Sequence, residues 1–357
     1  MRILAVNPGS TSTKISVFEN EGEVWDLKLS HSPEELSPFG PNIFEQYGFR
    51  RDVIVSALQE AGYPVESFDG IVGRGGLVKP IPGGTYLVDD NLLKDLKIGI
   101  LGQHASNLGG PIAAELAKTA SCEAFIVDPV VVDEMEPIAR FTGSPLLSRR
   151  SIFHALNQKA VARKAAKELG KDYDTCNFVV IHLGGGISVG AHRKGQVVDV
   201  NNALDGDGPF TPERSGGLPV GDLAKLCFSG DYTLGDLKKM IKGQGGIVAY
   251  LGTNDMMKVE DEVEKGNEEW LAVYRAMAYQ TGKETGAMAT VLKGNVDAVV
   301  VSGGIAYDKK FIGWLKEMIE FIAPVIVYPG EMEMEALALG ALRVLTKQEE
   351  PKAYNPE

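Results

Sequence analysis

The sequence predicts an α/β protein built from two similar halves, and three observations lead to this class. Strand and helix patterns alternate along most of the 357 residues, as in partly parallel sheets covered by helices. A strand, glycine turn, strand unit lies near the start of each half, with turns 176 residues apart at Gly9 and Gly185. The chain holds 42 glycines, well above the ~7% of an average protein, and they cluster between apolar runs.

The first of these units occupies the start of the chain. RILAVN (2–7) is a buried-strand pattern, PGSTS is a turn, and TKISVF (13–18) alternates like a strand. The turn carries Gly9 and a run of hydroxyls, followed by Lys14. Free backbone N–H groups, hydroxyls and a cation suit a phosphate. Taken singly, such a turn is more often only structural, and it lacks the helix that follows a Walker A loop.

The second unit has the same layout. FVVIHL (178–183) leads into the turn Gly184–Gly186, ISVGAH (187–192) leads out, and QVVDV (196–200) follows. His182 and Ser188 flank the turn. Either unit alone could be a chance hairpin, but two in matching positions favour phosphate sites and an internal duplication.

The remaining elements follow from periodicity. Helices are expected at 51–62, 89–97, 109–119, 151–169, 221–228, 234–242, 268–293, 309–322 and 334–346, and further strands at 68–73, 123–128, 297–302 and 324–328. The 268–293 helix has an apolar face that includes Tyr274 and Met277. Residues 25–50 resemble an irregular surface excursion, and the polar tail 349–357 is expected to be frayed.

Composition excludes several classes of function. The net charge of −12 argues against a nucleic-acid partner or an anionic membrane surface, because both need clustered cations. No apolar run approaches the roughly 20 residues that span a bilayer, and the N-terminal apolar stretch is too short for a signal peptide. Three widely spaced cysteines indicate a reducing compartment. We therefore expect a cytoplasmic protein with no membrane or nucleic-acid partner.

Glycine pairs and arginines mark further candidate positions. Gly303-Gly304 follows the strand DAVVV, where a nucleotide can lie against the backbone beyond a strand end. Arg74 stands between glycines after a short strand, and its guanidinium suits a carboxylate or a phosphate. Arg214 lies in the loop TPER. A plain turn and a surface arginine are the alternative interpretations.

Histidines and acids complete the candidates. His104 and His154 precede predicted helices, and no histidine spacing fits a zinc site. Asp128 ends the strand AFIVD. Glu331, Glu333 and Glu335 open the last helix, where acidic residues are favourable in any case.

Seven motifs together resemble the acetokinase family, the acetate and butyrate kinases within the sugar kinase and actin superfamily. They are NPGSTSTK, GRGG (73–76), RRSIFHALNQK (149–159), HLGGGIS (182–188), TPERSGG (211–217), VSGGIA (301–306) and VYPGEMEMEALALGALRVL (327–345). The resemblance covers essentially the whole chain. TPERSG, the last motif and the chain length are closest to the butyrate kinases.

This resemblance implies a fold and a reaction. Two duplicated actin-like, ribonuclease H-like domains would enclose a cleft, with residues 1–148 plus 335–357 in the N-terminal domain and 149–334 in the nucleotide-binding domain. ATP and a short-chain fatty acid, most simply butyrate, would give ADP and an acyl phosphate in a reversible in-line transfer with Mg²⁺. Acetate, propionate and branched acids stay open as substrates, and homodimers or higher homo-oligomers are usual.

The resemblance also assigns roles. The catalytic positions are Arg74, His104, Asp128, His154 and Arg214. The nucleotide-binding positions are Asn7, Ser10, Thr11, Ser12, Lys14, His182, Gly184, Gly185, Gly186, Ser188, Gly303 and Gly304. The magnesium positions are Glu333 and Asp128, with Glu331 and Glu335 as competitors for Glu333.

Two departures from the family pattern matter. Gly185 stands where acetate kinases have asparagine, which removes a side-chain donor. An ungapped alignment puts the family's second arginine at Gly221, so either that arginine is absent or Arg214 replaces it, which we favour. A slow ATPase switch of the same superfamily, or a sugar kinase with Asp128 as base, are the alternative functions.

Overall fold

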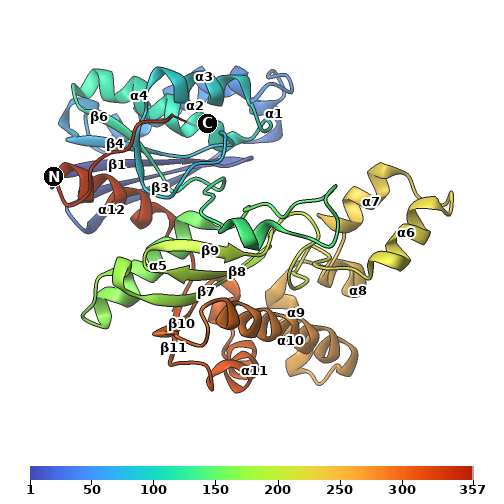
Figure 1. The fold of residues 1–357 in the computed structure, drawn as a ribbon. Helices are drawn as coiled ribbons and strands as arrows, with labels where there is room; N and C mark the ends of the chain where they lie inside the picture. The colour runs from blue at the N-terminus through green and yellow to red at the C-terminus, as the bar shows by residue number, and fades with distance from the viewer. Residues whose placement is uncertain (356–357) are drawn as a thin grey trace. The chain divides into compact units, whose positions relative to one another are not determined.

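The computed structural model describes residues 1–355, and its contacts divide the chain into two compact units. The first unit consists of Met1–Val132 and the chain from Met332 onward, and the second is Asp133–Glu331. Each unit is a mixed β-sheet covered by helices, so the predicted α/β class with two similar domains is confirmed (Figure 1). The sequence prediction placed the domain boundaries at 148–149 and 334–335.

A six-stranded sheet forms the first unit, in the order β3-β2-β1-β4-β6-β5. Its strands are β1 (Arg2–Pro8), β2 (Ser12–Glu19), β3 (Gly22–Ser30), β4 (Gly70–Arg74), β5 (Thr85–Leu87) and β6 (Glu123–Val127). β1 pairs antiparallel with β2 and parallel with β4, which in turn is parallel to β6. The ends of β1, β4 and β6 therefore lie at one edge, which is where parallel sheets bind ligands.

The helices of the first unit are α1 (Pro33–Leu36), α2 (Tyr47–Glu60), α3 (Asp90–Ile98), α4 (Gly109–Ala120) and α12 (Glu333–Leu345). All of them except the short α1 bury apolar residues. The core between α2, α4 and the sheet includes Leu4, Ile71 and Ile112, all fully buried. α12 returns from the far end of the chain to pack on β1, β4 and β6. Gly340 permits this approach, because a Cβ there would lie 2.5 Å from the side chain of Val127.

The five-stranded sheet of the second unit repeats the first. Its order is β11-β10-β7-β8-β9, with strands β7 (Asn177–Leu183), β8 (Ile187–Arg193), β9 (Gln196–Val200), β10 (Ala298–Gly303) and β11 (Val325–Pro329). β7 pairs antiparallel with β8 and parallel with β10, as β1 does with β2 and β4. The first sheet differs by one additional edge strand, β5. The duplication inferred from two glycine turns thus extends to whole sheets.

The second unit carries more helix than the first. Its helices are α5 (Ala155–Glu168), α6 (Val220–Phe228), α7 (Leu234–Ile241), α8 (Ile247–Leu251), α9 (Met256–Glu264), α10 (Glu268–Val291) and α11 (Lys309–Ile319). α5 packs on β7 and β10, and α10 packs on β7 and β8. Tyr274 and Met277 of α10 lie in the core with Val179, so the predicted buried face of this helix is confirmed.

Two predictions about local structure are wrong. Most of 25–50 is regular, because β3 and α2 extend into it at its two ends and α1 lies between them. β3 escaped prediction because its side chains are mostly exposed, so it lacks an apolar face. The tail is packed as far as it is described: Lys352 pairs with β5, and Tyr354 is buried with its hydroxyl donating to Asp95 at 2.8 Å.

Two further properties bear on the class of protein. In the described part of the chain, no helix combines the length and the apolar character needed to cross a membrane. Cys122, Cys176 and Cys227 are free thiols, and burial raises the pKa of the Cys122 thiol to about 11.

Candidate active site

The turn between β1 and β2 is held by its own backbone. Gly9 donates its N–H to the carbonyl of Ser12 at 2.7 Å, while Ser10 and Thr11 are exposed. Lys14, opposite Asn7 in the hairpin, is also exposed. The predicted phosphate residues of this turn are therefore presented on the surface of the first unit.

A buried arginine binds the same turn from the protein side. Arg50 of α2 is fully buried, and its Nη1 donates to the carbonyls of Gly9 at 2.8 Å and Ser12 at 3.1 Å. Its Nη2 donates to the carbonyl of Ser10 at 3.0 Å, and Gln46 accepts a further bond. Burial lowers the pKa of Arg50. Since the turn's carbonyls are bound to a guanidinium, its remaining backbone donors are available to an anion.

Three predicted site residues from distant parts of the sequence meet at the ends of β1 and β4. Arg74 forms an ion pair with Glu333 at the start of α12. Asn7 donates to the other oxygen of Glu333 at 2.8 Å. Gly73 is required beside Arg74, because a Cβ there would lie 2.1 Å from the carbonyl of Gly109. Of the three competing glutamates, Glu333 is the one that contacts these residues.

Asp128 and His104 lie on nearby connections of the first unit. Asp128 follows β6, is 1% exposed, and has a positive φ of 37°, which is uncommon for a residue other than glycine. Its Oδ1 accepts from the N–H of Gly84 at 2.7 Å, which fixes the carboxylate. His104 is exposed and caps a 3-10 helix, with Nδ1 2.8 Å from the hydroxyl of Ser106. Both residues thus have structural partners as well as their predicted roles.

The glycine turn of the second unit is bound to the TPER loop. Thr211 donates to the carbonyl of Gly185 at 2.7 Å. The Arg214 guanidinium lies on Gly186, where an added Cβ would be 1.7 Å from Nη1. Gly221 lies instead on α6, with no atom within 4 Å of an added Cβ. Arg214, the favoured replacement for the family's second arginine, therefore contacts the turn, whereas Gly221 has no such contact.

Two histidines stack beside this turn. The imidazoles of His154 and His182 have centroids 3.9 Å apart and planes inclined by 21°. His154 Nδ1 is 2.9 Å from the Ser188 hydroxyl at the start of β8. His182 Nδ1 is 2.9 Å from Asn157 Oδ1. The structure thus brings His154 to His182 and Ser188, which the sequence already placed on the two sides of the turn.

A cavity of about 600 Å³ lies within the second unit, and both of its predicted glycine loops contribute to it. Its volume is within the range of small-molecule and cofactor sites. The lining residues are Gly184, Gly185, Pro212, Glu213, Asn254, Asp255, Met256, Met257, Glu260, Tyr274, Gly304, Ile305, Tyr307, Asp308 and Glu331. Gly303 has a φ of 97° and lies against Leu183, where an added Cβ would be 2.2 Å from the carbonyl oxygen. Gly304 is exposed, with no atom within 4 Å of an added Cβ.

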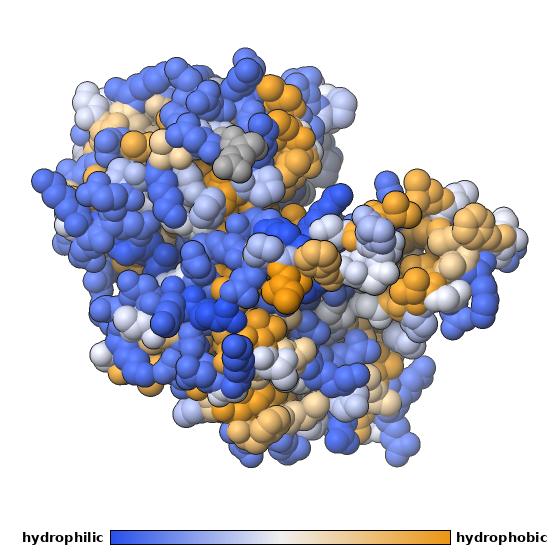
Figure 2. Space-filling view, in the orientation of Figure 1, coloured by the Kyte–Doolittle hydropathy of each residue, from blue (hydrophilic) through white to orange (hydrophobic). Residues whose placement is uncertain are grey.

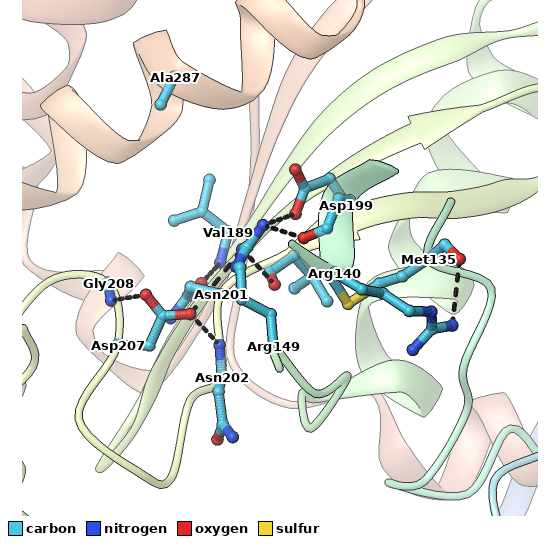
Figure 3. A network of polar contacts seen from close by, with 12 residues as sticks. Met135, Arg140, Arg149, Val189, Asp199, Asn201, Asn202, Asp207, Gly208 and Ala287 are labelled. Carbon is cyan, nitrogen blue, oxygen red and sulfur yellow. Dashed lines mark hydrogen bonds and ion pairs between the residues drawn. The ribbon is translucent and has the colours of Figure 1, made fainter. Parts of the chain in front are cut away.

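Arg149 anchors the segment that leads to His154. Its guanidinium donates to Asp199 at 2.8 Å and to the carbonyl of Val200 at 3.1 Å, both on β9 (Figure 3). Burial raises the pKa of Asp199, which Arg149 opposes. Next to it, Asn201 accepts from the N–H of Val189 at 2.7 Å and so holds β8 beside Ser188. Arg149 therefore connects the segment that leads to His154 with strand β9 of the second sheet.

Among residues 1–355, no three His, Cys, Asp or Glu side chains lie close enough together to hold a metal ion. The carboxylates at the strand ends of the first unit are Asp128 and Glu333. One or two carboxylates, completed by phosphate oxygens and water, are the usual protein share of a magnesium–nucleotide complex. The donors present fit a metal ion that arrives with its nucleotide.

Repeated mixed sheets with helices on them, and a cavity lined by two glycine loops, define a two-domain α/β protein with an actin-like fold. The solved structures agree with this fold. Acetate kinase of Porphyromonas gingivalis superposes with a TM-score of 0.77 at 18% identity, covering 97% of this chain and 99% of that one. A propionate kinase of Francisella tularensis superposes with a TM-score of 0.74 at 17% identity, covering 95% and 98%.

Sequence comparison gives the family. Residues 137–319 match the acetokinase family. Over 353 residues the chain is 55% identical to butyrate kinase 2 of Clostridium acetobutylicum, covering 99% of both chains. The protein belongs to the acetokinase family and is a carboxyl-group kinase.

Several residues around the site escaped sequence reasoning. Arg50 was missed because the helix was expected from residue 51, whereas α2 begins at Tyr47. Gln158 and His192, described below, lie within motifs or strands that were recognised without being assigned a role. Asn254 lines the cavity from a loop with no phosphate-type pattern, and Tyr307 lines it from the end of the 3-10 helix Gly304–Tyr307, one residue beyond the recognised motif. Hydrophobic periodicity cannot identify such positions, because only the tertiary packing of the segments that carry them brings them to the cavity.

Proposed function

We propose that this kinase transfers the γ-phosphoryl group of ATP to the carboxylate of a short-chain fatty acid, with butyrate as the preferred acid. A carboxylate oxygen forms a bond to the γ-phosphorus while the bond to the β–γ bridging oxygen breaks, giving acyl phosphate and ADP. The attacking carboxylate is already ionised near neutral pH, so the step needs no general base. The 55% identity to a clostridial butyrate kinase supports butyrate over the other acids.

The cavity of the second unit is the proposed nucleotide site. Gly184 and Gly185 reach it from one sheet connection and Gly304 from another, so backbone groups approach a ligand from both. Gly304 leaves room for a base or sugar, because its missing side chain faces no protein atom within 4 Å. This cavity, shared by the two predicted glycine loops, is the observation that carries the nucleotide assignment.

The proposed acid-binding residue is Arg74. Its guanidinium already pairs with a carboxylate, that of Glu333, and a fatty acid offers the same group. Asn7 holds the second oxygen of Glu333, which keeps the glutamate at the strand ends. We propose that Glu333 and Asp128 hold the Mg²⁺ that accompanies ATP, directly or through water, and that this ion screens the phosphate charge.

In this proposal, residues of the second unit stabilise the negative charge on the phosphoryl group that is transferred. Phosphoryl transfer is accelerated by placement and by donors aimed at the equatorial oxygens. Arg214 and His154 both lie at the Gly184–Gly186 turn, the former on Gly186 and the latter stacked on His182. We assign them to the transferring phosphoryl group, and the hairpin donors from Ser10 to Lys14 to the phosphates.

Hydroxylamine trapping tests the reaction directly. Purified protein with MgATP and butyrate should give butyryl hydroxamate, and omission of the acid should abolish it. A kcat/KM series over acetate, propionate, butyrate and isobutyrate then sets the preference, since one methylene changes this ratio by about 10- to 200-fold. A higher value for acetate than for butyrate contradicts the substrate proposed.

The same assay separates the alternative functions. A slow ATPase switch would lose ATP without forming hydroxamate. A sugar kinase would release ADP in response to a polyol. Either result, in place of butyrate-dependent hydroxamate, overturns the proposed reaction.

We also propose a cytoplasmic homo-oligomer, at least a dimer. Apolar side chains gather over α6 and α7 on the surface (Figure 2). Val220, Phe228 and Leu234 are 78%, 90% and 69% exposed, so α6 and the start of α7 bury almost nothing within this chain. Such patches mark interaction surfaces. Light scattering should give at least twice the 38.4 kDa chain mass, and Phe228→Glu should lower it.

A further inference from the structure

A continuous line of polar contacts runs from His154 into the second unit. Ser188 Oγ lies 2.9 Å from His154 Nδ1 and 2.8 Å from Gln158 Nε2. Gln158 Oε1 lies 3.0 Å from His192 Nε2, and His192 Nδ1 lies 2.8 Å from the Tyr173 hydroxyl. Ser188, Gln158 and His192 are buried, so water does not interrupt these contacts. Each hydrogen along this line of contacts can therefore be placed on one of the two atoms that it joins.

The side-chain amide of Gln158 sets the direction of the hydrogen bonds along this line. Its Nε2 donates to the backbone carbonyl of Ser188 at 3.0 Å, and a carbonyl oxygen can only accept. The amide oxygen must then face His192, and it too can only accept. His192 consequently carries a proton on Nε2.

His192 is neutral in this environment. It is fully buried, and burial, followed by the charges of Lys159 and Arg163, holds its pKa well below the usual value. With the proton on Nε2, its Nδ1 is an acceptor and receives the Tyr173 hydroxyl proton. The inner end of the line is thus fixed without ambiguity.

The Ser188 hydroxyl fixes the hydrogen positions at the outer end of the line, next to His154. Ser188 Oγ receives Gln158 Nε2 at 2.8 Å and, over a longer contact of 3.5 Å, the backbone N–H of His154. These two donors use both lone pairs of the hydroxyl oxygen. Its own hydrogen then points at His154 Nδ1, which must accept it.

We propose that Ser188 and Gln158 hold His154 as a neutral imidazole with its proton on Nε2. The ring then carries its one N–H on Nε2, in a fixed direction, and has no positive charge. The close stack on His182, at 3.9 Å between centroids, also disfavours a positive charge on both rings. The role of this donor toward a phosphoryl oxygen rests on the proposed function, but the tautomer does not. Ser188 and Gln158 are positioning residues in this scheme.

Ring-nitrogen NMR of the intact protein tests the tautomer. The chain has only five histidines, so His154 is assigned in ¹⁵N-histidine-labelled protein by its loss in His154→Gln. At a pH above the histidine titration range, the wild-type spectrum should show a protonated Nε2 and an unprotonated Nδ1. A proton on Nδ1, or an averaged pair of shifts, overturns the proposal.

Variants test the positioning residues. Ser188→Ala removes the hydroxyl and Gln158→Met removes the amide at similar length, and each should average the two His154 tautomers. Ser302→Ala is the matched control, because that hydroxyl bonds Asn157 at 2.6 Å on the His182 side and should leave the His154 shifts unchanged. A wild-type pattern in Gln158→Met would refute its part in the line.

Kinetics links the tautomer to the reaction. Both variants should lower kcat by about 10-fold, less than the full loss of one donor, because averaging of the tautomers keeps the Nε2–H in part of the molecules. The KM for the acid should be unchanged. The NMR readout needs no substrate. A wrong tautomer therefore defeats this inference alone, whereas a correct tautomer without acyl phosphate formation defeats the proposed function alone.

Discussion

The guanidinium of Arg50 donates to the carbonyl oxygen of Gly9 at 2.8 Å, so helix α2 holds the first glycine turn by its backbone. The same guanidinium also bonds the carbonyls of Ser10 and Ser12. Three carbonyls that would repel a phosphate are thereby turned toward a buried cation. The turn that we propose as a phosphate site is therefore ordered before a ligand binds, which is the condition for efficient electrostatic stabilisation.

Arg50→Lys should weaken nucleotide binding. Lysine keeps the charge but lacks the planar fork that reaches three carbonyls, so the turn loses its fixed geometry. We expect the KM for ATP to rise about 10-fold, equivalent to about 1.4 kcal/mol, with little change in the KM for butyrate. Steady-state kinetics with each substrate varied checks this.

The neighbouring arginine supplies a control for Arg50. Arg51 is partly exposed and pairs with Asp52 and Glu115, away from the turn. Arg51→Lys should leave the KM for ATP unchanged. Equal effects of the two substitutions would refute a specific role of Arg50.

Arg74→Ala should cost about 2–4 kcal/mol in transition-state binding, or a fall of about 30- to 1000-fold in kcat/KM for the acid. The reason is the loss of the cation that is proposed to bind the carboxylate at the strand ends. Arg2→Ala is a suitable comparison, since Arg2 starts β1 and pairs with Glu19 on the exposed side. An unchanged kcat/KM for Arg74→Ala would remove Arg74 from the site.

Gly186→Ala should act through Arg214. A Cβ on Gly186 would lie 1.7 Å from Nη1 of Arg214, so the guanidinium must move away from the turn. We expect the kcat/KM of Gly186→Ala to match that of Arg214→Ala, and the double variant to be no worse than either, because both remove one interaction.

Gly313→Ala is the control for Gly186. Gly313 lies on α11, outside the proposed site, and no atom is within 4 Å of an added Cβ. Activity within about threefold of the wild type is expected for a change of this size. If the losses in kcat/KM of Gly186→Ala and Arg214→Ala add up in the double variant, Gly186 acts independently of Arg214.

His192 should make stability depend on pH. Its folded pKa lies well below 6.5, so below that pH the unfolded chain binds a proton that the folded chain does not. The contribution of neutral His192 to the free energy of unfolding is fully present above pH 6.5. It is lost as the pH falls toward the folded pKa of His192, at about 1.4 kcal/mol per pH unit. Denaturant unfolding from pH 7 to pH 5, compared with His192→Gln, measures this slope. Parallel curves for the two proteins would contradict it.

Much of the fold was open to prediction from sequence. The strands around Asn7 and His182, and the helix that carries Tyr274, have clean apolar periods, and these periods are what sheets and helix faces bury. β3 and the tail around Tyr354 failed for the opposite reason. Their polar sequences do not show that a neighbouring strand or a buried pocket will hold them.

The residues of the candidate site also fall into two groups, those that the sequence could identify and those that only the tertiary structure selects. Gly9, Arg74 and Gly303 could be selected because each stands at a strand end within a recognisable turn. The sequence left three glutamates for one metal role, and it left open whether the family's second arginine is absent or replaced by Arg214. The contact of Arg74 with Glu333, and the position of Arg214 on Gly186, favour one choice in each case.

The sequence by itself determined the α/β class, the duplication and the glycine turns, because these depend on local periodicity and on backbone freedom at short range. Only the tertiary structure decided which side chains serve those turns. Arg50 reaches Gly9 across 41 residues, and Glu333 reaches Asn7 across 326. Contacts over such separations follow from how helices pack on the sheets, and no local pattern encodes a partner so far along the chain.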